Sequence, residues 1–497
     1  MVALLLFLLT LQTTPLSAQS PASAFPNLEP DPKAAEFARR GQTGPYTWQD
    51  LTEISLWASG ADADASPARG QPSYRALIAA AVQELQNAPD LPQNERERGE
   101  YVLTFMHKKF LKSYSALQTR IDTILSNGRY NCVSSAVLYL ILADAVELEV
   151  KGVMTRDHAF ISVHADGEAI DVETTNPYGF DPGNRREFHD DFGKLTGFAY
   201  VPARNYRDRT TINALELVSL ILHNRIADLE SRKRFAEAVP LAVNRASLLA
   251  GRLDGISSSI FEDPEKDLID RLLNYGVSLI NGGKEDDGLR WAAMASAKYP
   301  NPVQWQEFIY TAANNRMVKL SRGNHSSEAR AFLTANANLL SPENFKLLDS
   351  MTTDAELTEM SNRISRADQA EDILAALDRA EAEKRLPSGR AKELRNFVIL
   401  KTASLLSAAP GRDWLAGIAW LESSITRYGA DSRLEQEIRT FKSNRAVDFH
   451  NRFAAAFNKK NYDEATQILR EGLAEFPDNR QLQNDRNTVE RAGVRGN

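Results

Sequence analysis

The sequence predicts two architectures in one chain: an α+β domain in the N-terminal half, followed by an all-α region of helical repeats. Three observations lead to this prediction. Apolar residues recur at helical spacing between about residues 47 and 146, and the pattern then changes to short strands up to residue 174. Beyond about Arg209 the chain is rich in Ala and Leu and has almost no strand pattern. Helices, then strands, then helices again are typical of an α+β domain joined to a helical one.

Composition and charge exclude some classes of partner. The 497 residues include 59 basic and 66 acidic side chains, and the formal net charge is −7. Because acidic and basic side chains are interspersed along the chain without a long basic block, we expect no nucleic-acid partner. A hydrophobic content of 43% is sufficient for real cores, and the length favours two or more domains. The aromatic residues of the C-terminal half are most simply core residues, so we predict no cofactor.

The first residues have the pattern of a secretory signal peptide. An apolar run from Val2 to Leu11 leads to small residues ending at Ala18, although no Lys or Arg precedes the run. The run is short for a membrane span, and no cysteine follows Ala18 to carry a lipid. We therefore predict a signal peptide over 1–18, cleavage near Ala18, export to a periplasm or the medium, and no membrane span in the mature chain. Residues 19–45 lack periodicity and are predicted to be a linker, with order beginning near Tyr46.

A helical lead-in is expected before the only cysteine. Helical patterns cover 47–59, 73–87, 96–114 and 116–125, with Gly- and Pro-containing breaks such as 66–72. The segment Val133–Val146 is apolar on nearly every face, which is typical of a helix buried inside a domain. Cys132 is predicted to lie in the first turn of that helix.

The strands of the predicted domain follow directly. Glu149–Met154, Ala159–Val163 and Ala169–Thr174 have the pattern of short strands, and Asp166-Gly167 is a typical two-residue hairpin turn. We expect the α+β domain, including its helical lead-in, to cover residues 46–209.

Residues 210–497 contain a recurring local pattern. Turn segments at 233–238, 282–288 and 459–465 each begin a second helix, and Pro300 and Pro477 close two of the units. These units resemble degenerate tetratricopeptide repeats. Residues 445–480 fit best and residues 341–410 fit poorly. The resemblance implies stacked helix pairs whose surface binds a protein partner.

Cys132 is the candidate nucleophile. It is the only cysteine, so it cannot form an intrachain disulfide, and a free thiol in an oxidising compartment is a liability unless it is buried or used. The free N–H groups at a helix N-terminus favour the reactive thiolate over the thiol. The alternative is that Cys132 is a small buried apolar residue, as most lone helix cysteines are.

His158 is the candidate general base, just before the first strand of the hairpin. A turn at Asp166-Gly167 pairs Ser162 with Asp171, and counting outward it pairs Phe160 with Glu173 and His158 with Thr175. Glu173 is then the diagonal neighbour of His158, and Asp171 lies one step further away. Either carboxylate could orient the imidazole, and the register favours Glu173.

Three motifs resemble those of the transglutaminase-like (papain-like) cysteine superfamily: Gly128-Arg-Tyr-Asn-Cys132-Val-Ser-Ser-Ala, Asp157-His158-Ala-Phe-Ile-Ser-Val and Ala169-Ile-Asp-Val-Glu173-Thr-Thr175. The resemblance covers about residues 95–205. It implies a Cys-His-Asp triad, with the acid of an Asp-x-Thr motif at Glu173 and its Thr at Thr175. This chain departs from the pattern by having Glu in place of Asp and an additional Asp171. Ala169 replaces the usual aromatic residue, so the oxyanion partner cannot be transferred, and only the backbone N–H of Cys132 is expected to contribute.

The expected function is amide acyl transfer or hydrolysis by an exported enzyme that acts on a protein or peptide, as a thiol protease, amidase or cross-linking enzyme. The alternative is a non-catalytic binding or scaffold protein whose repeats engage a partner and whose transglutaminase-like domain is a relic. A metal site built from His158, His164, Asp171 and His189 is not predicted, because these residues lack any tight ligand spacing.

Overall fold

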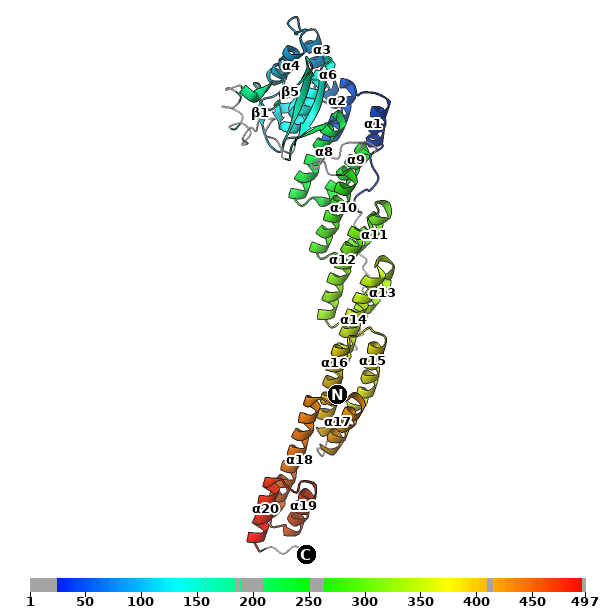
Figure 1. Ribbon diagram of the computed structural model, residues 1–497, viewed down its shortest axis with the longest axis vertical. Helices are drawn as coiled ribbons and strands as arrows, with labels where there is room; N and C mark the ends of the chain where they lie inside the picture. Colours follow the sequence, from blue (N-terminus) through cyan, green and yellow to red (C-terminus); the bar gives the residue numbers. More distant parts are fainter. Residues whose placement is uncertain are drawn as a thin grey trace, which may run out of the picture. The chain divides into compact units, whose positions relative to one another are not determined.

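The computed structural model describes residues 25–156, 158–184, 209–250, 263–408 and 414–493, together with Phe188 and Gly193. These residues are mostly helical, with a four-stranded antiparallel sheet and a two-stranded parallel ladder (Figure 1). The chain divides into two compact units, and the division along the sequence falls between Phe308 and Ile309. In the described ranges, no helix combines the length and the apolar character needed to cross a bilayer.

Among the residues described from Phe25 onward, six helices precede the four-stranded sheet, and three of them confirm the predicted ranges 47–59, 73–87 and 133–146. The prediction of one helix over 96–114 is wrong, because the helix ends at Lys109 and Ser113–Tyr114 forms strand β1. Here the carbonyl of Gly128 accepts hydrogen bonds from the N–H groups of Lys112 and Ser113, and this holds the chain extended beside β2. The elements are α1 (Pro32–Thr43), α2 (Trp48–Ser59), α3 (Tyr74–Gln86), α4 (Glu95–Lys109), α5 (Ile121–Asn127), β2 (Arg129–Tyr130) and α6 (Cys132–Ala145).

Helix α1 corrects the prediction that residues 19–45 are a linker. Asp31 caps the helix by accepting a hydrogen bond from the N–H of Lys33, and Pro32 occupies the first helical position. This is the usual start of a helix. Phe37 is 1% exposed, and α1 packs against α9. The burial of Phe37 orders a segment whose sequence shows no clear periodicity.

The sheet has the strand order β5-β4-β3-β6, with every neighbouring pair antiparallel. Its strands are β3 (Glu149–Met154), β4 (Ala159–Ala165), β5 (Glu168–Val172) and β6 (Thr210–Ile212). The first three confirm the predicted strands. Because β6 is the edge strand beside β3, the sheet domain extends beyond the predicted boundary at 209.

The β4–β5 hairpin confirms the predicted turn and most of the predicted register. Asp166 and Gly167 have φ values of 53° and 83°, as a type I′ turn requires. Ser162 opposes Asp171 as predicted. The pairing predicted further out, of Phe160 with Glu173 and of His158 with Thr175, is wrong, because β5 ends at Val172 and the N–H of Glu173 donates to the carbonyl of Gly179 instead.

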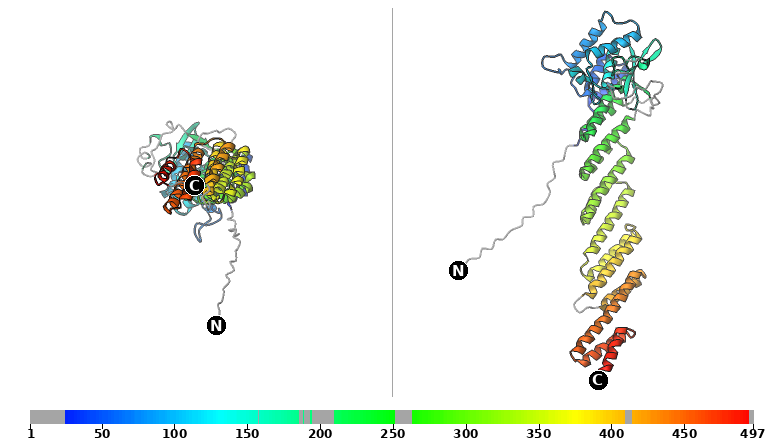
Figure 2. Two further views of the ribbon diagram at one scale, coloured as in Figure 1. Left: turned by 90° about the horizontal axis from the view of Figure 1, so that it is seen from below. Right: turned by 90° about the vertical axis from the view of Figure 1, so that its left-hand side faces the viewer.

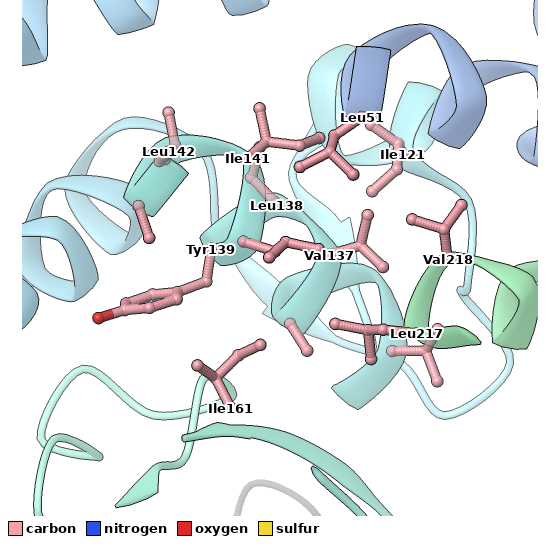
Figure 3. Close-up of a cluster of buried hydrophobic side chains, with 14 of the residues drawn as sticks. Leu51, Ile121, Val137, Leu138, Tyr139, Ile141, Leu142, Ile161, Leu217 and Val218 are labelled. Carbon is pink, nitrogen blue, oxygen red and sulfur yellow. The ribbon is translucent and has the colours of Figure 1, made fainter. Parts of the chain in front are cut away.

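The core of the first unit forms around α6, which is buried on nearly every side (Figure 3). Figure 3 shows Leu51 and Ile121 on one side of α6, with Ile161 of β4 and Leu217 of α8 on others. Each fully buried side chain of this size contributes about 1.5–3 kcal/mol to folding. This dense packing fixes α6, and with it the helix start that carries Cys132.

The helices after the sheet pack in chain order within the first unit, α8 on α9, α9 on α10 and α10 on α11 (Figure 2). Helix α8 also packs against α2, α6 and β3. The helices after the sheet therefore begin as part of the sheet-containing unit and not as a separate domain at residue 210. The helices are α8 (Ala214–Ser231), α9 (Phe235–Leu249), α10 (Pro264–Asn281), α11 (Glu285–Lys298) and α12 (Pro302–Arg322), which crosses the boundary between the units.

The second unit continues this pattern with helices that mostly pack on their chain neighbours. Left-handed backbone at Lys233, Gly283 and Lys460 marks the three predicted helix turns. Asn324 and Lys384 have the same conformation, so the repeated turn extends into the stretch that fits the repeat pattern poorly. The helices are α13 (Ser326–Ala335), α14 (Pro342–Arg363), α15 (Ala370–Ala382), α16 (Ser388–Ser407), α17 (Trp414–Tyr428), α18 (Ser432–Asn458), α19 (Tyr462–Glu475) and α20 (Arg480–Arg491).

Candidate active site

Cys132 is the first residue of α6, as predicted, and its thiol is free and partly exposed. A capping box holds the helix start: the side chain of Asn131 accepts from the N–H of Ser134, and the N–H of Asn131 donates to the Ser134 hydroxyl, both at 3.0 Å. The Asn131 amide also donates to the carbonyl of Ala116 at 3.0 Å. The thiol is thereby fixed at the positive end of a buried helix, where an anion is favoured.

His158 joins the thiol to a carboxylate. Its Nε2 lies 2.6 Å from Oε2 of Glu173, and the two side chains are 11% and 3% exposed. His158 also forms a hydrogen bond with the side chain of Cys132. Because a carboxylate only accepts, Nε2 carries the proton and Nδ1 remains for the thiol. The backbone carbonyl of His158 accepts from the N–H of Thr155 at 2.9 Å, which fixes the residue before β4 begins.

The pKa of His158 is raised well above its ordinary value of 6.5. Burial lowers this pKa, but the charge of Glu173 and the hydrogen bonds to Cys132 and Glu173 outweigh the effect of burial. The imidazolium is therefore the favoured form at neutral pH, with a proton available between the thiol and the carboxylate.

Glu173 is held on its second oxygen by Thr175. Oε1 accepts from the Thr175 hydroxyl at 2.7 Å and from the Thr175 N–H at 3.3 Å. The carbonyl of Thr175 in turn accepts from the Tyr130 hydroxyl at 3.1 Å. Both oxygens of the buried carboxylate are thus hydrogen-bonded, and this keeps the carboxylate aimed at His158.

A tight turn closes the segment that carries Glu173. Gly179 accepts from the N–H of Glu173 at 2.8 Å and donates to the carbonyl of Asn176 at 3.0 Å. A Cβ added at Gly179 would lie 1.9 Å from the carbonyl oxygen of Glu173. Only glycine fits there without moving the segment.

We expect Gly179→Ala to displace Glu173 and to lower the rate at which Cys132 is alkylated at neutral pH by at least about tenfold. The measurement is the iodoacetamide rate constant by mass spectrometry. Gly183→Ala is the matched control, because a Cβ at Gly183 meets nothing within 4 Å. Equal rates for the two variants would show that the turn does not position the carboxylate.

Asp171, the second carboxylate considered from sequence, is directed to another partner. Arg209 binds it with both guanidinium nitrogens, one of them at 2.6 Å, and the same guanidinium lies 5.2 Å from the ring of Phe160. The Phe160 ring stacks on His158 at 6.1 Å. Asp171 therefore belongs to a neighbouring ion pair on the sheet, and Glu173 is the carboxylate on His158.

Two aromatic groups beside the site were not predicted as site residues. Tyr114 opposes Tyr130 across the β1–β2 ladder, with ring centroids 6.0 Å apart. Burial, followed by the charges of Cys132 and Glu173, raises the pKa of Tyr114, so its phenol stays protonated and can donate a hydrogen bond. No sequence signal identified Tyr114, because residues 96–114 have a helical pattern.

His107, on α4, is the second such group, and it contacts the segment that carries Glu173. Its Nε2 lies 3.1 Å from the carbonyl of Thr174, and its ring packs edge-on against Tyr130 at 6.1 Å. Burial lowers the pKa of His107 to about 4, although the hydrogen bond to Thr174 opposes this. The Thr174 hydroxyl lies 2.8 Å from that of Ser135 on α6. Side chains from α4 and α6 therefore both contact Thr174, the residue that follows Glu173.

The shifted pKa values of His107 and His158 predict that these residues change the unfolding free energy with pH in opposite directions. The pKa of folded His107 is depressed, so its contribution is present above about pH 6.5 and is lost as the pH falls toward 4. The pKa of folded His158 is raised, so its contribution is present below about pH 6.5 and is lost as the pH rises through the folded value. Urea unfolding across pH should show a flatter acid limb in His107→Gln and a flatter alkaline limb in His158→Gln. Slopes unchanged from wild type would contradict the assignments.

No cluster of three or more potential metal ligands exists among the described residues. His164 lies on β4 opposite Glu149 and Ala169, and His189 lies outside the described residues. His158 and Asp171 each have a different partner, as described above.

Comparison with known proteins adds little to this geometry. No protein-family model matches the chain, and no curated protein matches it. Among solved structures, the chain is similar to menin in the crystal structure that reveals the binding site for the Mixed Lineage Leukemia (MLL) protein. The two chains are 16% identical, the match covers 77% of this chain and 98% of the menin chain, and the TM-score is 0.29. A TM-score this low supports no inference about fold or function.

Proposed function

We propose that Cys132, His158 and Glu173 form the catalytic triad of a transglutaminase-like enzyme that cleaves or transfers amide acyl groups. The observation that carries the proposal is the position of His158, which is hydrogen-bonded to the thiol of Cys132 and to the carboxylate of Glu173 at the same time. Acyl transfer through cysteine needs at least a nucleophile in contact with a base and an acid in contact with that base, and these three residues have that arrangement.

In the proposed reaction, the thiolate of Cys132, paired with the imidazolium of His158, attacks the amide carbonyl and the C–S bond forms. The backbone N–H of Cys132 stabilises the oxyanion, and we propose the Tyr114 hydroxyl as the second donor. The imidazolium of His158 gives its proton to the leaving amine as the C–N bond breaks, and this leaves an acyl-thioester. Water or an acceptor amine then attacks the thioester carbonyl while His158, oriented by Glu173, takes its proton. The C–S bond breaks, and the thiolate of Cys132 leaves a carboxylic acid or a new amide as the product.

The test is covalent trapping of Cys132 by a peptide probe that carries an amide-mimicking, thiol-reactive group. We expect wild-type protein to be trapped at least about 100-fold faster than His158→Ala, and Cys132→Ala not to be trapped. Because the chain has one cysteine, the site of trapping is unambiguous. Equal trapping rates in wild type and His158→Ala would exclude His158 as the activating base.

The second candidate function is binding, and consecutive packing of the helices from α8 onward favours it. We propose that these tetratricopeptide-like repeats hold a protein partner and that the chain is exported after removal of residues 1–18, which lie outside the described residues. If the triad is a relic, Cys132→Ala will retain every activity of the protein in its cell. Loss of activity in Cys132→Ala with unchanged folding supports the enzyme.

A further inference from the structure

The segment Phe25–Asp31, called the strap below, precedes α1 and has no helix or strand of its own; it bends at Glu29, whose N–H donates to the Asn27 side chain. It runs from α1 beside the helices that follow the sheet (Figure 1). Its Leu28 is 7% exposed, although the strap has no regular hydrogen-bonded partner strand. The contacts of the strap are with the side chains of α11, α9 and α2.

The first part of the strap lies on α11. The ring of Phe25 lies 5.8 Å from the ring of Trp291 and 6.0 Å from the guanidinium carbon of Arg290. Further along, Glu29 pairs with Lys298. Trp291 and Lys298 lie seven positions apart on α11, about 10 Å along its axis, and they contact Phe25 and Glu29, which are four positions apart in the strap. The strap therefore follows the axis of α11.

The backbone of the strap is bound by helix side chains. The hydroxyl of Tyr299, at the end of α11, donates to the carbonyl of Leu28 at 2.8 Å. The side-chain oxygen of Asn244, on α9, accepts from the N–H of Asp31 at 2.7 Å. Side chains that bind both a carbonyl and an N–H of an extended segment are suited to peptide recognition, since the backbone gives affinity and the pockets give specificity.

The end of the strap is tied to the sheet-containing part of the unit. The indole N–H of Trp57, on α2, donates to Asp31 at 2.9 Å, while Asp31 also caps α1. The strap is therefore anchored at Asp31, and its earlier residues extend from this anchor over α11.

We propose that the face formed by Asn244, Arg290, Trp291, Lys298 and Tyr299, called the strap face, is a binding site for extended peptides. The strap occupies it as an intramolecular ligand. A partner for this face is an extended peptide with an aromatic residue, a leucine three positions later and an acidic residue next to the leucine, which is the pattern of Phe25, Leu28 and Glu29. Such a peptide must displace the strap, so the strap limits access to the site. The proposal goes beyond the triad and does not depend on it.

The test uses the full-length protein and a fluorescein-labelled peptide with the sequence of residues 24–31, followed by fluorescence anisotropy. In wild type the strap competes at high effective concentration, so we expect weak binding. In a chain with Phe25→Ala and Leu28→Asp, whose strap is weakened, we expect saturable binding at least about tenfold tighter than in wild type. Adding Tyr299→Phe to that chain, which removes the donor to the Leu28 carbonyl, should weaken binding by at least about fivefold. The same peptide with Asp at the Leu28 position is the control probe and should not bind.

No saturable binding to the folded, strap-weakened chain would overturn the proposal, because a strap that is only a part of the fold cannot be replaced in trans. If that chain fails to fold, the deciding measurement is limited proteolysis of Asn244→Ala, which leaves the strap sequence intact. We expect the protease Glu-C to cleave the strap after Glu29 at least about threefold faster in this variant than in wild type. Unchanged trimming would equally overturn the proposal. Alkylation of Cys132 should stay at the wild-type rate in these variants, which separates this test from that of the triad.

Discussion

Glu173→Gln is expected to slow acylation of Cys132 by an amide-mimicking probe by roughly two to four orders of magnitude. The amide of glutamine has nearly the same shape as the carboxylate but no charge. The charge of Glu173 raises the pKa of His158, and its oxygen lies 2.6 Å from Nε2. Its loss removes both the electrostatic support of the imidazolium and the tautomer control that leaves Nδ1 facing the thiol.

Asp171→Asn is the matched control for Glu173→Gln, because it removes an equivalent charge from the same hairpin. Asp171 is bound by Arg209 and makes no hydrogen bond to His158 among the described contacts. We expect its acylation rate to stay within about threefold of wild type. A loss in Asp171→Asn equal to that in Glu173→Gln would contradict the assignment of Glu173 as the third member.

The largest stability effect is expected at Asp267 on α10. Its carboxylate accepts from Arg245 at 2.8 Å and from Arg271 at 2.9 Å, and the side chains of Asp267 and Arg245 are 4% and 6% exposed. Removing one partner of a buried ion pair leaves an uncompensated charge in the interior. We therefore expect Asp267→Ala to lower the unfolding free energy of the first unit by about 3–5 kcal/mol, measured by denaturant unfolding.

Glu265→Ala is the control for Asp267→Ala, since Glu265 lies on the exposed first turn of the same helix. We expect it to cost less than about 1 kcal/mol through the helix dipole. A transition in Asp267→Ala that coincides with that of Glu265→Ala would show that the buried pair contributes no net stability.

Local patterns in the sequence were sufficient to predict how the residues of the proposed triad are placed. The apolar run after Cys132 predicts a buried helix, and the Asp166-Gly167 turn sets a register that makes Glu173 the diagonal neighbour of His158. The helix forms as predicted, and Glu173 does contact His158, but it does so from the loop after Val172 and not through the predicted strand register. The catalytic role of these residues is a separate matter and remains our proposal.

The parts that could not be predicted depend on contacts between distant segments. Arg209 pairs with Asp171 from beyond the hairpin, and no sequence pattern links the two residues. His107 and Tyr114 reach the site from a segment with a helical pattern, whose last residues are drawn into a strand by the carbonyl of Gly128. Likewise, α1 is ordered by packing of Phe37 that its own sequence does not predict.

The end of the hairpin illustrates the same limit. Alternation predicts that β4–β5 pairing continues to Glu173, but the N–H of Glu173 turns to Gly179. A loop that returns to the strand depends on the close approach that only Gly179 allows. The steric reason is clear once the fold is known, but a glycine among turn residues is not unusual in sequence.

The most direct measurement of the central claim is the rate constant for iodoacetamide with Cys132 from about pH 5 to 9 in wild type and in His158→Ala. If Cys132 is held as a thiolate paired with the imidazolium of His158, the wild-type alkylation rate at about pH 6 will lie within about threefold of the rate at pH 8. In His158→Ala the rate at about pH 6 will fall at least about tenfold and will rise with pH like that of an ordinary thiol. Superimposable profiles for the two proteins would contradict the triad.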